Sequence, residues 1–326
     1  CFQIGKVTQT GKLTFQNNND QLNLDVAEYR DLWFSTSAAL DAKQNNCAEE
    51  RFANYKIVPL KFNFPPSFNG KLSPSNNPKI KAAIIREKGS NSEREMAYAM
   101  FSAGFEVYDI HMTDLIEGRK TLEEFKFIAA VGGFSNSDVL GSAKGWAGAF
   151  LYNPRAKKSL DDFFAREDTL SLGVCNGCQL FVELGMITPT HKELPKMNHN
   201  TSGKFECQFT AVNIGSSSSI MLRGLEGSTL GIWAAHGEGK FHLPMDESQY
   251  QIPGKYHKAI YPANPNGSDY NAAMLCSDDG RHLVMMPHLE RSTFPWNWAH
   301  YPKDRSDEFS PWIISFENAK RWLETK

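Results

Sequence analysis

The chain has 326 residues, enough for one large domain or two modest ones, and a formal net charge of −2. Its basic residues are scattered, so it has no electrostatic footprint for nucleic acid. No apolar stretch approaches the length of a membrane span and no signal-peptide pattern opens the chain. Six cysteines in this length fit a reducing, cytoplasmic compartment better than a disulfide framework.

The N-terminal region, residues 1–60, opens with a hairpin pattern that pairs residues 5–8 with residues 12–15. A helix is predicted over residues 25–43, where apolar side chains recur at helical spacing. The sequence begins at Cys1 in what reads as the middle of a domain, so we expect a fragment of a longer polypeptide. Residues 61–78 are rich in Pro, Asn, Ser and Gly and predict a linker.

From residue 79 to residue 326, predicted strands alternate with predicted helices. The strands fall at residues 82–85, 105–108, 127–131 and 170–174, and the helices at residues 93–102, 144–151 and 160–165. This alternation predicts an α/β fold with a doubly wound, mostly parallel sheet, whose active site lies at the carboxyl ends of the strands. A hairpin pattern at residues 278–280 and a closing helix over residues 312–323 predict a sheet that is mixed at one edge.

One apolar run, residues 170–174, stops at Cys175, with Gly177 in the turn and a helix pattern directly after it. A strand, a tight turn and a helix form a nucleophile elbow, which lifts the side chain clear of the sheet. The helix N-terminus favours a thiolate. Two other interpretations stay open: a small buried hydrophobe, or a Cys-x-x-Cys pair with Cys178 that serves redox chemistry or half of a zinc site. The other four cysteines lie singly, which disfavours zinc.

A second cluster follows the apolar run 283–286, where His288 and Glu290 lie two residues apart. A cysteine on an elbow with a histidine and a carboxylate has the parts of a Cys-His-Glu triad. The alternative is a surface salt-bridge set beside Arg291. Gly132 and Gly133 end another apolar strand, near the same edge of the sheet, where backbone N–H donors to an oxyanion are needed, although a glycine pair can also simply turn a corner.

Six segments carry a family resemblance: residues 86–97, 132–141, 170–180, 235–241, 264–268 and 287–291. In order and without large gaps, they resemble the glutamine amidotransferase domain of the large form of phosphoribosylformylglycinamidine synthase, from purine biosynthesis. The chain departs from the family at two places. Asn136-Ser137 replaces the usual Tyr-Gly, and Leu289 replaces the usual Pro.

The resemblance implies the fold of a class I glutamine amidotransferase, which is flavodoxin-like. It also implies hydrolysis of glutamine through a Cys175 thioester, with His288 moving protons and Glu290 orienting His288. The N–H groups of Gly133 and Asn176 are the implied oxyanion hole, and the residues implied to bind glutamine are Gln179, Gly237 and Glu238. His236 can equally be a core histidine without a catalytic role.

The resemblance further implies a carbon–nitrogen ligase that uses glutamine as its amido-nitrogen donor. An ATP-dependent synthetase would use the ammonia to convert formylglycinamide ribonucleotide to the amidine. ATP and Mg²⁺ are then expected in upstream synthetase domains of the same polypeptide, of which residues 1–60 would be the tail. We expect no cofactor or metal in this chain itself. The alternatives are a stand-alone Cys-based γ-glutamyl hydrolase or peptidase, and a non-catalytic interaction domain of the same fold.

Overall fold

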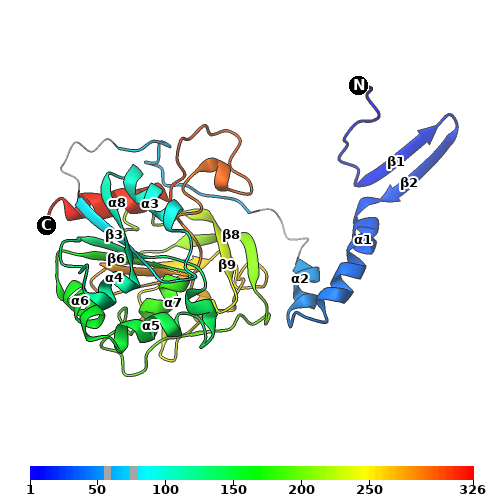
Figure 1. Ribbon diagram of the computed structural model, residues 1–326. Helices are drawn as coiled ribbons and strands as arrows, with labels where there is room; N and C mark the ends of the chain where they lie inside the picture. The colour runs from blue at the N-terminus through cyan, green and yellow to red at the C-terminus, as the bar shows by residue number, and fades with distance from the viewer. Residues whose placement is uncertain (55–59, 74–79) are drawn as a thin grey trace. The chain divides into compact units, whose positions relative to one another are not determined.

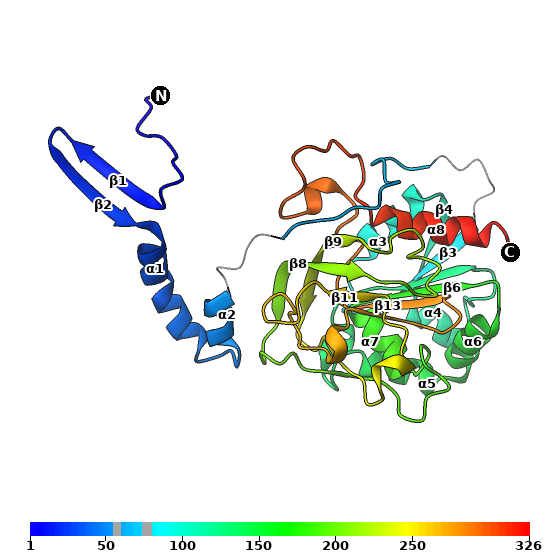
Figure 2. The same ribbon diagram turned by 180° about the vertical axis from the view of Figure 1, so that it is seen from behind.

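The computed structural model describes residues 1–54, 60–73 and 80–326. The chain divides into two compact units, Cys1–Lys56 and Ile57–Lys326, shown in Figures 1 and 2. Among the described residues, no helix has both the length and the apolar character needed to cross a bilayer.

The first unit contains one hairpin and two helices. Strands β1 (Lys12–Asn17) and β2 (Asp20–Asp25) pair antiparallel, and helices α1 (Val26–Asp41) and α2 (Ala48–Asn54) follow. The predicted pairing of residues 5–8 with 12–15 is wrong, because the chain reverses later, at Asn18, which takes a left-handed φ of 50°. The predicted helix is confirmed, and the Asp25 side chain caps it by accepting the N–H groups of Ala27 and Glu28.

A six-stranded sheet forms the centre of the second unit, in the order β12-β13-β6-β5-β3-β4. Its strands are β3 (Ile80–Arg86), β4 (Phe105–His111), β5 (Phe127–Ala130), β6 (Leu170–Val174), β12 (Met274–Cys276) and β13 (His282–Met285). All neighbours are parallel except β12 and β13, which pair antiparallel. The predicted α/β fold, with a sheet mixed at one edge, is therefore confirmed.

Helices cover both faces of this sheet, as Figures 1 and 2 show. Helices α3 (Glu93–Ser102) and α8 (Ile313–Leu323) lie on one face. The other face carries α4 (Met112–Glu117), α5 (Lys144–Leu151), α6 (Pro154–Ala165) and α7 (Asn176–Glu183). Strands β5 and β6 are buried along their whole length, as expected for central parallel strands covered on both sides.

The register brings three loops to one edge of the sheet. Ala130 at the end of β5 is level with Gly173 of β6, and Val174 is level with Met285 of β13. The chain leaves these strands toward Gly132, Cys175 and His288 respectively. Residues far apart in sequence are thus brought together at the carboxyl ends of neighbouring strands.

A second, antiparallel sheet was not predicted from the sequence. It has the order β11-β8-β9, formed by β8 (Glu206–Ile214), β9 (Thr229–His236) and β11 (Gly254–Tyr256). The short strands β7 (Lys196–Asn198) and β10 (Lys240–His242) pair separately. Strand β9 is important for the site, because His288 forms an isolated antiparallel bridge with Trp233 of this strand.

The segment predicted to be a linker, residues 61–78, is described up to residue 73. That part packs against the second unit instead of forming a free connection. Asn63 exchanges two backbone hydrogen bonds with Thr229, and the ring of Phe62 packs edge-on against Trp298. Phe68 is buried. Burial of Phe68 and partial burial of Phe62 and Phe64 outweigh the loop-forming composition of the segment. Residues 74–78 lie outside the described residues.

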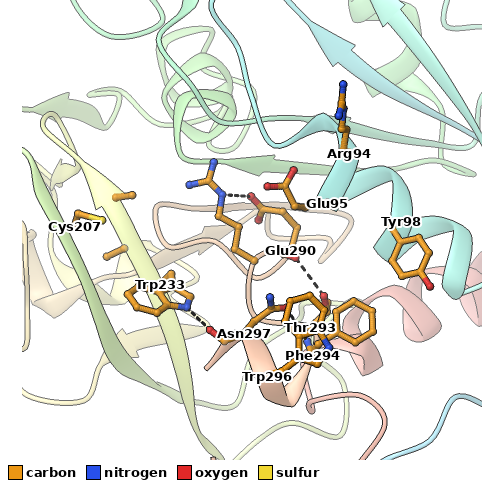
Figure 3. Close-up of a pocket in the computed structure, with 13 residues that line it drawn as sticks. Arg94, Glu95, Tyr98, Cys207, Trp233, Glu290, Thr293, Phe294, Trp296 and Asn297 are labelled. Carbon is orange, nitrogen blue, oxygen red and sulfur yellow. Dashed lines mark hydrogen bonds and ion pairs between the residues drawn. The ribbon is translucent and has the colours of Figure 1, made fainter. Parts of the chain in front are cut away.

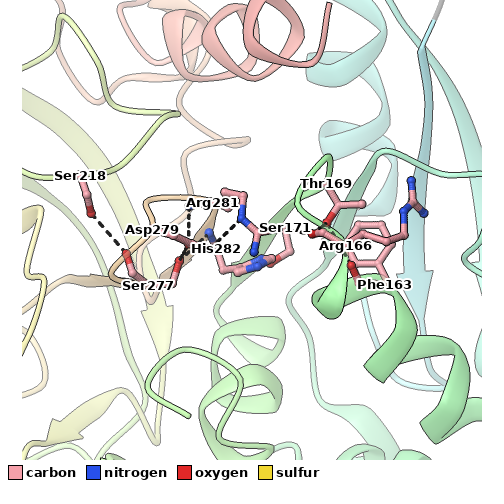
Figure 4. A network of polar contacts seen from close by, with 9 residues as sticks. All are labelled: Phe163, Arg166, Thr169, Ser171, Ser218, Ser277, Asp279, Arg281 and His282. Atoms are coloured by element: carbon pink, nitrogen blue, oxygen red, sulfur yellow. Dashed lines mark hydrogen bonds and ion pairs between the residues drawn. The ribbon is translucent and has the colours of Figure 1, made fainter. Parts of the chain in front are cut away.

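A polar network ties β6 to β13 at the end of the sheet opposite to the cysteine loop (Figure 4). The His282 ring is hydrogen-bonded to the Ser171 hydroxyl at 2.9 Å and stacks on Phe164. Burial, assisted by the charge of Arg281, lowers the pKa of His282 from 6.5 to about 4. The carboxylate of Asp279 raises the pKa of His282, but its effect is smaller than the lowering effects of burial and of Arg281.

The lowered pKa of His282 predicts that the folded state loses stability in acid. Between pH 6.5 and 4 the unfolded chain binds a proton that folded His282 does not bind. The free energy of unfolding should therefore fall as the pH drops through this window, by up to about 1.4 kcal/mol per pH unit from this group. His282→Gln should flatten that dependence in urea titrations, whereas the exposed His199→Gln should not. An identical pH dependence in wild type and His282→Gln would contradict the assignment.

Candidate active site

The Cys175 elbow joins β6 to α7. Cys175 has φ 53° and ψ −107°, outside the regions that L-residues ordinarily populate. Its backbone N–H donates to the carbonyl of Met285 at 2.9 Å, which fixes the turn to the end of β13. Helix α7 also lies very close to β5: a Cβ on Gly177 would lie 2.0 Å from the Ala130 carbonyl oxygen. The elbow therefore requires glycine at position 177.

His288 and Glu290 lie in the loop after β13, and both are buried. The His288 Nδ1 and the Glu290 Oε1 are 2.6 Å apart. The His288 backbone N–H donates to the carbonyl of Trp233 at 2.8 Å, so strand β9 holds the loop in place. The Cys175 thiol in turn donates to the carbonyl of Ala235 on the same strand, with a sulfur–oxygen distance of 3.5 Å.

The electrostatics of the three groups favour a charged His288. Burial opposes protonation, but the carboxylate of Glu290, together with the charge and hydrogen bonding of Cys175, outweighs it and raises the pKa of His288 to about 9. Burial also opposes ionisation of Glu290, yet His288 lowers the pKa of this carboxyl group below its usual value. The buried arrangement is thus a histidine that holds a proton, between the carboxylate of Glu290 and the sulfur of Cys175.

Gly132 makes room for the side chains of His288 and Cys175, a role that sequence reasoning missed. A Cβ at this position would lie 2.8 Å from the Cε1 of His288 and 3.4 Å from the Cβ of Cys175. The first distance is too short for any side chain. The only sequence signal is that a glycine pair ends the β5 strand pattern.

Gly132→Ala should accordingly displace His288 while the sheet stays folded. We expect kcat for glutamine hydrolysis to fall by roughly 10²-fold, because a shift of about 1 Å is enough to misalign reacting groups. Gly215→Ala is the matched control, since a Cβ there would meet nothing within 4 Å. Steady-state kinetics and circular dichroism on both variants test this. Equal activity in the two variants would show that His288 tolerates the added methyl group.

The N–H groups of Gly133 and Asn176 are predicted to form an oxyanion hole, and neither is used in the described secondary structure around it. Gly133 occupies the non-hydrogen-bonded position of a bridge with Ser90, so its N–H points away from that partner. Asn176 is the first residue of α7, where backbone N–H groups have no partner within the helix. The Asn176 side chain is also fixed, accepting from the Ser135 N–H and donating to Gln179.

A pocket of about 260 Å³ opens at Cys175. The three residues predicted to bind glutamine, Gln179, Gly237 and Glu238, all line it. The Gln179 side chain is buried and donates to the Glu238 carbonyl at 2.7 Å, which connects α7 to the loop after β9. These three residues therefore lie around the same small cavity as Cys175.

His236 also lines this pocket and is 2% exposed. Burial, assisted by the charge of His288, lowers the pKa of His236 to about 3. His236 is therefore neutral at physiological pH, and neither of its ring nitrogens has a hydrogen-bond partner among the described residues. A second general base with so low a pKa would be weak, which agrees with leaving His236 out of the predicted triad.

A larger cavity of about 880 Å³ lies beside the triad carboxylate (Figure 3). Glu290 faces it, between Trp233 of β9 and Tyr98 of α3. Arg291 lines the same cavity: its Nε is 3.9 Å from the Glu290 carboxylate, and its guanidinium donates to Asn91 at 2.8 Å. Because Glu290 is buried, the alternative of a surface salt-bridge set is wrong.

The alternative roles for the Cys175–Cys178 pair find no support in the geometry. Cys178 is completely buried in α7, and burial raises the pKa of its thiol well above the usual range. Over residues 1–54, 60–73 and 80–326, no group of three or more His, Cys, Asp or Glu side chains is placed to hold a metal ion. A thiol so deeply buried is poorly suited to exchange.

Cys175 lies on a strand–turn–helix elbow at one edge of a mostly parallel sheet, and a buried histidine–carboxylate pair follows a neighbouring strand; cysteine-dependent acyl-transfer enzymes use this arrangement. The sequence matches the CobB/CobQ-like glutamine amidotransferase domain over residues 79–323, and the chain belongs to this family.

The curated relatives include phosphoribosylformylglycinamidine synthases. One from Arabidopsis thaliana, described as chloroplastic/mitochondrial, is 43% identical over 99% of this chain and 25% of its own length. The human synthase is 40% identical over 99% of this chain and 27% of its own length. The chain thus spans about a quarter of the length of these relatives. The solved structure of PurLQS from Thermotoga maritima shares the fold, with a TM-score of 0.60 and 22% identity, covering 75% of this chain and 99% of that one.

Proposed function

We propose that this domain hydrolyses glutamine to glutamate and ammonia, with Cys175, His288 and Glu290 as its catalytic residues. The observation that supports this most directly is the buried His288–Glu290 pair beside a strained Cys175, at a pocket of about 260 Å³. The proposal also rests on the similarity to the synthases, which covers nearly the whole chain.

The residues supply each step of the chemistry. The Cys175 thiolate attacks the side-chain carboxamide carbon of glutamine, and the carbonyl oxygen becomes an oxyanion that accepts hydrogen bonds from the N–H groups of Gly133 and Asn176. The His288 imidazolium protonates the departing nitrogen, because an amide anion cannot leave at neutral pH. Breaking the carbon–nitrogen bond releases ammonia and leaves a γ-glutamyl thioester.

Hydrolysis of the thioester uses the same groups in reverse. Neutral His288 takes a proton from water, and the hydroxide attacks the thioester carbon. The carbon–sulfur bond breaks, which restores the Cys175 thiolate and the His288 imidazolium and releases glutamate. Glu290 keeps the Nδ1 proton of His288 in place during both half-reactions, and its charge stabilises the imidazolium.

In the longer protein we propose that the ammonia passes to an ATP-dependent synthetase site, where formylglycinamide ribonucleotide becomes formylglycinamidine ribonucleotide in purine biosynthesis. ATP and Mg²⁺ would act in that part of the polypeptide, which would be the partner of this domain. Similarity to synthases about four times as long supports this assignment. The exposed apolar side chains of α1, such as Leu32 and Trp33, are consistent with residues 1–60 belonging to that larger part. We also propose a cytoplasmic location, which suits the six free cysteines.

Two assays test the proposal. The chain is incubated with glutamine and, separately, with γ-glutamyl peptides, and glutamate and ammonia are measured. Hydrolysis of the peptides alone would make the domain a γ-glutamyl hydrolase or peptidase, and hydrolysis of neither would favour an interaction domain. Glutaminase turnover of the chain is then compared with that of the full-length protein supplied with ATP and formylglycinamide ribonucleotide. We expect turnover to be higher in the full-length protein with its substrates. A glutaminase site that is completed only by the loaded synthetase site does not waste glutamine when those substrates are absent.

A further inference from the structure

Arg291 directly follows the triad carboxylate and forms contacts that the reaction steps above do not use. Its Nε lies 3.9 Å from the Glu290 Oε1, which is the ion pair that Arg291 forms among the described residues. Its guanidinium also donates to the side-chain oxygen of Asn91 at 2.8 Å and to the hydroxyl of Ser92. One cation therefore contacts both the triad loop and the segment that leads into α3.

Glu290 needs this support, because its own hydrogen bonding holds one of its two oxygens. The Oε1 faces the His288 Nδ1 at 2.6 Å, whereas the Oε2 is buried and has no hydrogen-bond partner among the described residues. Glu290 also lines the cavity of about 880 Å³, which leaves room for the carboxylate to rotate away from His288 (Figure 3). Attraction to the neighbouring guanidinium opposes that rotation, and salt screens a buried charge less than an exposed one.

The other end of Arg291 is fixed to the segment that packs on Gly132. The Asn91 N–H donates to the Gly132 carbonyl at 2.8 Å, and Gly132 lies directly against the His288 ring. The contacts thus close a ring that runs through His288, Glu290, Arg291, Asn91 and Gly132. Each member limits the movement of its two neighbours, so Arg291 helps to set the position of the histidine as well as that of the carboxylate.

Ser92 supports this interpretation. It is the N-cap residue of α3, where a serine side chain usually accepts a hydrogen bond from the first turn, yet its side chain does not cap the helix. The hydroxyl accepts from Arg291 and lies 3.3 Å from the Asn91 Oδ1, while the backbone takes a left-handed φ of 73°. The segment thus forgoes a side-chain cap and an unstrained backbone, and its hydroxyl binds the guanidinium instead.

The charge of Arg291 acts in the same sense as these contacts. Burial opposes ionisation of Glu290, but His288 and then Arg291 lower the pKa of its carboxyl group. Loss of the arginine charge should therefore raise the pKa of Glu290. The other charged side chains that line the cavity come from α3: Arg94 and Glu95, which carry opposite charges (Figure 3).

We propose that Arg291 is a positioning residue that holds the Glu290 carboxylate against His288. Its hydrogen bonds to Asn91 and Ser92 provide the anchor. This inference rests on the proposed function and adds a fourth side chain to the support of the triad. Arg291 acts through Glu290 and not on the substrate. A lysine would keep the charge but would lack the planar fork that contacts three groups at once.

The test combines kcat and KM for glutamine with a ¹³C NMR titration of the Glu290 carboxyl carbon. In Arg291→Gln, kcat should fall at least about 10-fold and KM should change less than about threefold, because the change misaligns the triad and leaves the pocket at Cys175 intact. Glu290 should take up its proton at a higher pH than in the wild type. Arg291→Lys should restore that titration but only part of kcat.

Ser92→Gly separates positioning from a purely structural role. Glycine relieves the left-handed backbone, which offsets the lost hydrogen bond, so the urea midpoint should stay close to that of the wild type while kcat falls at least about threefold. Should Arg291→Gln fail to fold, this variant and Arg291→Lys decide the question. The exposed Arg223→Gln is the charge-matched control and should change neither kcat nor the Glu290 titration.

Two results would overturn the proposal: unchanged kcat in folded Arg291→Gln or in Ser92→Gly, or a Glu290 titration in Arg291→Gln that is identical to that of the wild type. The titration does not depend on turnover, whereas turnover of glutamine by the wild type tests the proposed function. Failure of one is therefore distinguishable from failure of the other.

Discussion

Replacing Cys175 by serine or alanine is expected to lower glutamine hydrolysis by at least about 10³-fold, because no other group in the pocket can form the thioester. The second unit should stay folded, since the side chain is small and its role is chemical. Glutamate release and mass-spectrometric detection of the γ-glutamyl thioester measure the effect directly.

Cys178→Ala is the matched control for this prediction. Its sulfur is fully buried in α7, so the variant loses a little packing, of the order of 1 kcal/mol, without touching the pocket. Much of the activity should be retained. Equal loss in the Cys175 and Cys178 variants would restore the redox dithiol as the explanation.

The second large effect is expected for Glu290→Gln, with kcat falling roughly 10²- to 10⁴-fold and KM changing much less. The amide keeps the shape of the carboxylate but removes its charge. Without this charge, the pKa of His288 should fall from its raised value of about 9, although Cys175 still favours the protonated form. A smaller fraction of His288 would then carry the proton that departing ammonia needs.

As the pH rises, His288 should lose its proton later in the wild type than in Glu290→Gln. A wild-type His288 with a raised pKa keeps its proton up to about pH 9, so the charged pair is lost only as the pH rises through that value. In Glu290→Gln the same loss should occur at lower pH, and an NMR titration of His288 measures it. Glu123→Gln, at an exposed position, is the control. A variant with unchanged kcat and unchanged titration would remove Glu290 from the mechanism, and His288→Ala should be at least as damaging.

The central sheet and the positions of Cys175 and His288 at one of its edges could be predicted because their signals are local. The run before Cys175 is mostly apolar and ends at a glycine-bearing turn, so the elbow is visible in a few residues. The position of His288 after a strand places it at the same sheet edge by topology alone.

Other features depend on contacts that the sequence does not display. Gly132 matters through the space it leaves for His288, which is 156 positions away in the chain (288 − 132). Strand β9 anchors the triad through the carbonyls of Trp233 and Ala235, and backbone atoms carry no residue-specific signal. The composition of the segment after residue 60 predicts a loop. Burial of Phe62 and Phe68 nevertheless stabilises its packing by more than the conformational entropy that this packing costs.

The strained backbone of Cys175 implies a trade-off between stability and activity. A non-glycine residue at φ 53° and ψ −107° costs about 1–3 kcal/mol, which the surrounding contacts must offset. Glycine would relieve that strain, so Cys175→Gly should unfold at a higher denaturant concentration than Cys175→Ala although both are inactive. Selection for stability alone would therefore favour glycine at this turn, whereas the proposed chemistry requires cysteine.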